Sequence, residues 1–138
     1  MNRSIVFAVD TVPVTWKRAA RNGRRTYTDP VMAAAQTELA WAYKTTPGTW
    51  PPDTLTRFSV TIDVYTKTRR RADLDNFAKL VLDALEGHAY ANDAQVDELT
   101  VRRHHRPSHP GWKIAISTPH QDLGHQARTT TNQKANTQ

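Results

Sequence analysis

The sequence predicts a single α+β domain, in which a mixed sheet of about four to five strands packs with two main helices. Three observations support this fold class. The chain has 138 residues, enough for one modest core. Apolar and polar side chains alternate over residues 58–65, whereas residues 75–86 repeat their apolar side chains at helical spacing. We expect this domain to span residues 1–118 and the polar segment 119–138 to be a disordered tail, because it has too few apolar side chains to offset the entropy of ordering.

Local patterns locate the strands. The predicted strands are a first one that starts at residue 5 and ends near Pro13, and three more over residues 58–65, 96–103 and 112–117. The second is the clearest, because Phe58, Val60 and Ile62 alternate with polar neighbours, as in a strand buried on one face. The segment 17–25 is rich in Lys and Arg around Asn22-Gly23, a turn pair, and is expected to be a basic loop.

Two helices are predicted from capping signals and spacing, over residues 30–44 and 75–86. Asp29 is a candidate N-cap for the first, because Pro30 follows it at a position that favours proline. The second has an apolar stripe made of Phe77, Leu80, Val81, Ala84 and Leu85. That stripe matches the spacing of a helix packed on a core, and Gly87 ends it.

Charge and composition narrow the function classes. The 19 basic and 13 acidic residues give a net charge of +6, which makes nucleic acid the first partner to test. A basic surface can also confer solubility or attract anionic lipid. The absence of cysteine excludes a disulfide framework, a thiolate zinc site and a cysteine nucleophile. The apolar run at residues 5–9 is too short for a signal peptide or a membrane span, so we expect a cytoplasmic protein without membrane contact.

The segment 69–95 contains the residues that indicate chemistry. Asp73 and Asp75 lie two residues apart between a predicted strand and a predicted helix, so an extended link would let both converge on one point. A third carboxylate, Asp93, follows the helix in a turn. Hard oxygen ligands of this type suit Mg²⁺. Lys79 lies one helical turn after Asp75, on the same face, and can reach toward a bound phosphate.

Each of these residues also has an ordinary structural interpretation. Asp73 or Asp75 can cap the helix N-terminus. Asp93 can be an Asx-turn residue. Lys79 can form a solvent-exposed pair with Asp83 four residues later. Each of these explanations is plausible alone, but their combination in this order and spacing is much less probable by chance.

The order of these residues forms a recognisable motif. Its elements are Arg69-Arg70-Arg71, Asp73-Leu74-Asp75-Asn76, Lys79, Leu82-Asp83-Ala84-Leu85 and Asn92-Asp93-Ala94-Gln95-Val96. This pattern resembles the core motif of the RusA family of crossover junction endodeoxyribonucleases. There are two departures: Asn92 stands where the family has an aspartate, and Ala72 stands where some members have arginine.

The resemblance implies a function and its residues. Asp73, Asp75 and Asp93 would bind catalytic Mg²⁺, with Mn²⁺ able to substitute, and Lys79 would assist at the scissile phosphate. It also implies a homodimer that resolves four-way (Holliday) junctions or other branched DNA by paired phosphodiester hydrolysis, in DNA recombination and repair. The residues expected to contact DNA phosphates are Arg69, Arg70, Arg71, Arg102 and Arg103.

Two alternatives remain open. The chain could be a non-catalytic module that binds branched or double-stranded DNA through the same basic surface. The three carboxylates argue against this, because a pure phosphate binder gains nothing from acidic residues at the contact. Alternatively, the same nuclease chemistry could act on replication forks, flaps or RNA, and the sequence does not distinguish these substrates.

Overall fold

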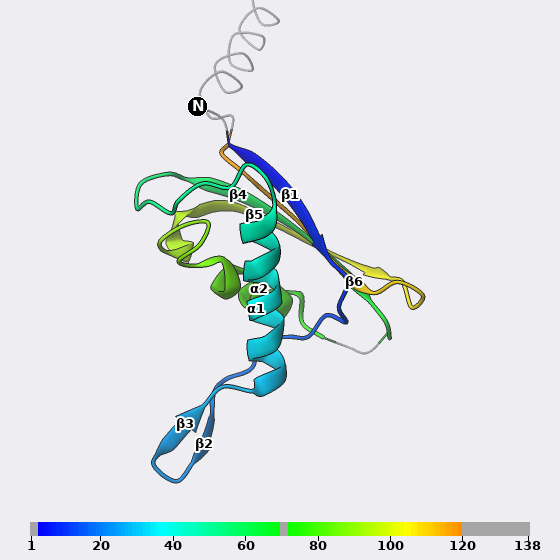
Figure 1. Cartoon of the computed structure of the whole chain (residues 1–138). Helices are drawn as coiled ribbons and strands as arrows, with labels where there is room; N and C mark the ends of the chain where they lie inside the picture. The colour runs from blue at the N-terminus through cyan, green and yellow to red at the C-terminus, as the bar shows by residue number, and fades with distance from the viewer. Residues whose placement is uncertain (1–2, 70–71, 120–138) are drawn as a thin grey trace, which may run out of the picture.

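The computed structural model describes residues 3–69 and 72–119 (Figure 1). The elements are β1 (Ser4–Val9), β2 (Ala20–Asn22), β3 (Arg25–Tyr27), α1 (Pro30–Thr45), β4 (Phe58–Thr66), α2 (Leu74–Leu85), the 3₁₀ turn η1 (Asp93–Gln95), β5 (Val96–His105) and β6 (Gly111–Ser117). Arg70, Arg71 and all of the predicted tail except Pro119 lie outside the described residues. No helix in the described part of the chain is long and apolar enough to cross a membrane.

Four strands form one sheet in the order β1-β6-β4-β5. β4 and β5 are parallel, whereas β6 pairs antiparallel with both β1 and β4. The predicted α+β class, with a mixed sheet and two main helices, is therefore confirmed. The parallel pair requires a crossover, and α2 provides it by connecting the end of β4 to the start of β5.

One face of this sheet forms the core. Along β4, Phe58, Val60 and Ile62 are almost completely buried, while the residues between them are only partly buried. The buried face packs against the apolar stripe of α2 and against Leu39 and Tyr43 of α1. Both helices lie on this side of the sheet (Figure 1). The two faces of the sheet therefore have different roles, because only one is covered by helices.

The two helices begin differently. In α1, Asp29 Oδ1 accepts hydrogen bonds from the backbone N–H groups of Val31 at 2.8 Å and Met32 at 3.5 Å, which confirms the predicted cap. Asp73 occupies the N-cap position of α2, but its side chain makes no capping hydrogen bond. The Asp73 carboxylate is therefore not used to stabilise the helix end.

The segment expected to be a basic loop contains a hairpin instead. β2 and β3 pair antiparallel in a sheet separate from the main one, with Asn22 opposite Arg25. Gly23 has φ +66°, the sign that a two-residue type II′ turn requires at its first central position. All three residues of β3 are exposed. β3 has no alternating apolar pattern because none of its side chains is buried, which explains why the sequence pattern did not predict this strand.

Candidate active site

A cleft of about 420 Å³ lies between α2, the edge strand β5 and the turn that follows the helix. Its lining residues are Leu74, Asp75, Ala78, Lys79, Leu82, Asp93, Leu99 and Val101. Three of the four predicted catalytic residues, Asp75, Lys79 and Asp93, therefore line the same cleft. The fourth, Asp73, is exposed and directly precedes the lining residue Leu74.

The spacing of α2 explains how its residues reach the cleft. Asp75 and Lys79 are four residues apart, so they lie on the same face of the helix in successive turns. Asp83 continues this row by another turn. Partial burial raises the pKa of the Asp83 carboxyl, and the nearby Asp93 carboxylate reinforces the effect while Lys79 opposes it. Asp83, to which the motif had assigned no chemical role, therefore interacts electrostatically with Lys79 and Asp93 although it does not line the cleft.

Trp16 contacts the same face of α2 from the segment before the hairpin. The Lys79 Nζ atom lies 4.6 Å from the centroid of the Trp16 ring, within the range of a cation–π contact. The backbone N–H of Trp16 donates to the Asn76 carbonyl oxygen at 3.0 Å. A side-chain hydrogen bond from Trp16 also lowers the pKa of Asp83, against the effect of burial. Trp16 thus limits the positions that Lys79 can adopt, a role signalled in the sequence only by an aromatic residue next to a basic segment.

The turn that carries Asp93 is stabilised by its neighbours. Asn92 Oδ1 accepts a hydrogen bond from the Ala94 N–H at 2.8 Å and so caps η1. The backbone N–H of Asp93 donates to Glu86 Oε1 at 3.0 Å. Asn92, not Asp93, therefore acts as the turn residue, and the carboxylate of Asp93 stays available to the cleft. The departure from the family motif at Asn92 places a good capping residue at this position.

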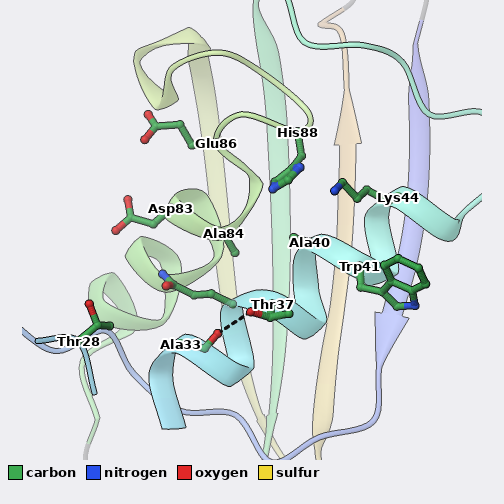
Figure 2. A pocket seen from close by; sticks show the side chains of 11 residues that line it. Thr28, Ala33, Thr37, Ala40, Trp41, Lys44, Asp83, Ala84, Glu86 and His88 are labelled. Carbon is green, nitrogen blue, oxygen red and sulfur yellow. Dashed lines mark hydrogen bonds between the residues drawn. The ribbon is translucent and has the colours of Figure 1, made fainter. Parts of the chain in front are cut away.

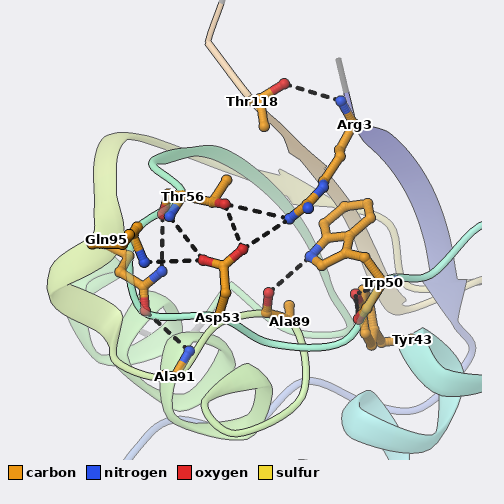
Figure 3. Close-up of polar contacts among 10 residues, drawn as sticks. Arg3, Tyr43, Trp50, Asp53, Thr56, Ala89, Ala91, Gln95 and Thr118 are labelled. Atoms are coloured by element: carbon orange, nitrogen blue, oxygen red, sulfur yellow. Dashed lines mark hydrogen bonds and ion pairs between the residues drawn. The ribbon is translucent and has the colours of Figure 1, made fainter. Parts of the chain in front are cut away.

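Gln95 connects this turn to the rest of the fold (Figure 3). Its side chain is 3 % exposed, and it is the only buried polar residue among those described. Gln95 Oε1 accepts from the N–H groups of Ala91 and Asn92, both at 3.0 Å, while Nε2 donates to the Thr56 carbonyl oxygen at 2.9 Å. The loop at Thr56 is itself held by Asp53, which accepts the Thr56 hydroxyl at 2.6 Å. Gln95 therefore helps to determine where Asp93 lies.

The geometry does not close three carboxylates around one point. Among residues 3–69 and 72–119, no group of three His, Asp or Glu side chains is placed to hold a metal ion. Asp75 is in the first turn of α2 and Asp93 lies beyond its end, and a 12-residue helix is about 18 Å long. Mg²⁺ commonly uses only one or two protein carboxylates and completes its shell with water and phosphate oxygens. Asp75 and Asp93 are ligands of this type that line the same cleft, and neither forms a salt bridge within the described residues.

The predicted DNA-binding arginines are divided between two faces. Arg103 pairs with Val64 in the sheet register and so lies on the helix side, where its guanidinium donates to the carbonyl oxygen of Ala72, beside Asp73. Arg102 lies on the opposite face and donates to Asp63 Oδ1 at 2.9 Å. Arg69 is exposed at the edge of the described region. Of Arg69, Arg102 and Arg103, which the structure describes, Arg103 is the one whose contact places it at the start of α2.

A second cavity of about 480 Å³ lies between α1 and α2 (Figure 2). Its lining includes Thr28, Trp41, Lys44, Asp83 and His88. It contains none of the four predicted catalytic residues. The predicted chemistry therefore belongs to the side of α2 that faces β5.

An acidic cleft with one lysine, in a basic α+β domain, defines the class: a protein equipped to act on nucleic-acid phosphates. The family model described as Endodeoxyribonuclease RusA matches residues 9–117, most of the chain. The chain therefore belongs to the RusA endodeoxyribonuclease family. A search of curated proteins gave no match.

Proposed function

We propose that this protein is a magnesium-dependent endonuclease that resolves Holliday junctions by paired phosphodiester hydrolysis. The observation that carries the proposal is the cleft that Asp75, Lys79 and Asp93 line, within a chain of the RusA family. Family membership supports DNA hydrolysis, and the cleft supplies residues of the required type.

The roles of the residues follow from their charges. Asp75 and Asp93 would hold Mg²⁺, with Asp73 joining them from the N-cap position of α2. Bound Mg²⁺ supplies a Lewis acid and lowers the pKa of water in reactions of this class. Lys79 places a positive charge at the phosphate, where negative charge increases in the transition state. Trp16 keeps the Lys79 ammonium over the cleft side of α2.

DNA would enter across the start of α2. Arg103 is on that side, and Arg69 precedes α2 in the sequence, so both are proposed to contact phosphates next to the cleaved one. Arg70 and Arg71 are proposed to join them on sequence grounds. Arg102 forms a hydrogen-bonded ion pair with Asp63 on the other face of the sheet. It would contribute only to the overall electrostatic potential of the protein.

Paired cutting requires two sites. We propose a homodimer, because a twofold-symmetric protein matches the near-twofold symmetry of a four-way junction. Light scattering should then report about twice the mass of one chain. A monomer that still makes paired incisions would contradict this.

The test is cleavage of synthetic four-way junction, fork, linear duplex and RNA substrates, each with and without Mg²⁺. The expected result is junction cutting that requires Mg²⁺ and is lost in Asp75→Asn. Asp10→Asn is the matched control, since Asp10 is an exposed aspartate that pairs with His109 away from the cleft. Junction binding without cutting under any condition would favour the non-catalytic module. Preferential cutting of forks or RNA would support the proposed nuclease chemistry but show that the substrate is not the four-way junction.

A further inference from the structure

The β2–β3 hairpin projects from the body of the molecule, away from the main sheet (Figure 1). All residues of β3 are exposed, and Tyr27 is 52 % exposed. A two-stranded hairpin alone is marginally stable in water. Burial in the core therefore does not explain why the chain extends here.

The hairpin and the segment leading to it carry one sign of charge. Residues 11–28 contain five Lys and Arg residues and no Asp or Glu. Lys17 is held at the base, where its Nζ lies 3.4 Å from Asp29. Arg18, Arg24 and Arg25 are exposed, and none forms a salt bridge to another described residue. Unpaired like charges repel one another, so their concentration here favours an external polyanion.

The chain on both sides of the hairpin lies next to α2, the helix that carries Asp75 and Lys79. Before it, Trp16 contacts Lys79 and donates to the Asn76 carbonyl oxygen. After it, Thr28 lines the second cavity, between α1 and α2, together with Asp83 (Figure 2). The base of the hairpin therefore lies against the row of charged residues on α2, and its tip extends outward from there.

We propose that the β2–β3 hairpin is an arm that follows the phosphate backbone of duplex DNA next to the cleft. This inference rests on the proposed function for the presence of DNA at the site. Each three-residue strand is about 10 Å long. One DNA strand presents about three phosphates over that length, at 3.4 Å of axis each. Arg24 at the turn and Arg25 at the start of β3 are placed to neutralise two of them.

The test compares two variants that lose the same charge. Arg24→Gln/Arg25→Gln removes two cations from the arm. Lys44→Gln/Lys113→Gln removes two from exposed sites elsewhere, on α1 and β6. Lys44 lies about 21 Å along α1 from the end next to the hairpin. Affinity for a four-way junction and for a linear duplex is measured against salt concentration in EDTA, so that cleavage is not needed.

The arm variant should lower the slope of log affinity against log salt by about 1.8, or roughly 0.9 for each lost contact. The control should change it by much less. Equal changes in both variants would show that the hairpin contributes only general surface charge, and would overturn the proposal. An unchanged slope in the arm variant would overturn it too, as would a parent chain that binds no DNA. Cleavage is scored separately: a parent that cuts while the arm variant keeps its slope defeats the arm alone. A parent that binds through the arm but never cuts defeats only the nuclease proposal.

Discussion

Two groups of aspartates in this protein have opposite electrostatic environments. On the outer face of the sheet, Asp63 Oδ1 lies 2.9 Å from Arg102 Nε and 2.8 Å from His104 Nε2. The hydrogen bond from Arg102 holds the pKa of Asp63 below its ordinary value. In the cleft, Asp75 and Asp93 form no salt bridge within the described chain, and burial raises the pKa of the neighbouring Asp83.

The difference separates structural charges from available ones. Asp63 has its partners within the fold, so a ligand would have to displace them. Within the described residues the cleft carboxylates lack such partners. Asp83 is partly buried near Asp93 and Glu86, an arrangement that raises its pKa. Clustered, incompletely neutralised groups of this kind are typical of functional sites. The following predictions test this contrast, from the largest expected effect to the smallest.

The largest effect should come from neutralising the cleft aspartates. Asp75→Asn and Asp93→Asn should each lower junction cleavage by about 10²-fold or more, the scale seen when one preorganised electrostatic group is lost. Asp73→Asn should do the same without unfolding α2, because the Asp73 side chain makes no capping hydrogen bond that the substitution could remove. Junction affinity should stay the same or increase, since a negative charge near phosphate is removed.

Asp63→Asn is the control on the opposite face and should leave the cleavage rate within a few-fold of the parent. Cleavage rates and gel-shift affinities measure both quantities. Substantial Mg²⁺-dependent cutting by Asp75→Asn would show that the cleft is not the active site.

The second prediction concerns the support of the Asp93 turn. Gln95→Leu removes the side-chain acceptor of the Asn92 N–H and one of the two acceptors of the Ala91 N–H, so it should lower the free energy of unfolding by about 0.5–1.5 kcal/mol for each hydrogen bond lost. Cleavage should fall as Asp93 loses its position. Asn92→Asp should change stability by only a few tenths of a kcal/mol, because aspartate also caps η1. Urea denaturation measures both variants, and equal losses would show that the Gln95 contacts have no special role.

The third prediction isolates the contact between Trp16 and Lys79. A cation–π contact of about 0.5–2 kcal/mol corresponds to roughly 2- to 30-fold in rate, so Trp16→Leu should lower kcat within that range. Junction affinity should change little, because no phosphate contact is removed. Trp41→Leu is the matched control, since Trp41 is 65 % exposed on α1. A loss of affinity with unchanged kcat would assign Trp16 to DNA binding and not to the positioning of Lys79.

The smallest effect is a pH dependence of opposite sign in the two regions. The raised pKa of Asp83 means that its contribution to stability is present at low pH and is lost as pH rises through its folded pKa. Asp83→Asn should therefore raise Tm at pH 7, with a gain that shrinks as pH falls through the raised folded pKa of Asp83 and is gone below about pH 4. The lowered pKa of Asp63 means that its contribution is present above about pH 4 and is lost in acid. Asp63→Asn should lower Tm at pH 7, and its Tm should approach that of the parent in acid. Thermal melts across pH measure both variants, and a change of Tm in the same direction for both would contradict the contrast between the two regions.

Much of the fold could be predicted because its signals are local. The alternation over Phe58 to Val64, the apolar stripe of α2 and the Asp29-Pro30 start of α1 each depend on a few neighbouring residues. The motif likewise identified Asp75, Lys79 and Asp93, which share the cleft. These features are determined by strand and helix periods of 2 and 3.6 residues, which the sequence carries directly.

Tertiary structure decided how these elements meet. The contact of Trp16 with Lys79 joins residues 63 positions apart in the chain, and the bonds of Gln95 to the loop at Thr56 join another distant pair. Strand alternation alone separates Arg102 from Arg103, but only the packing of α2 shows that Arg103 lies beside Asp73. The hairpin was missed because exposed strands need no apolar pattern. Sequence periodicity determines which face of an element is buried, whereas distances between elements depend on how their side chains pack together.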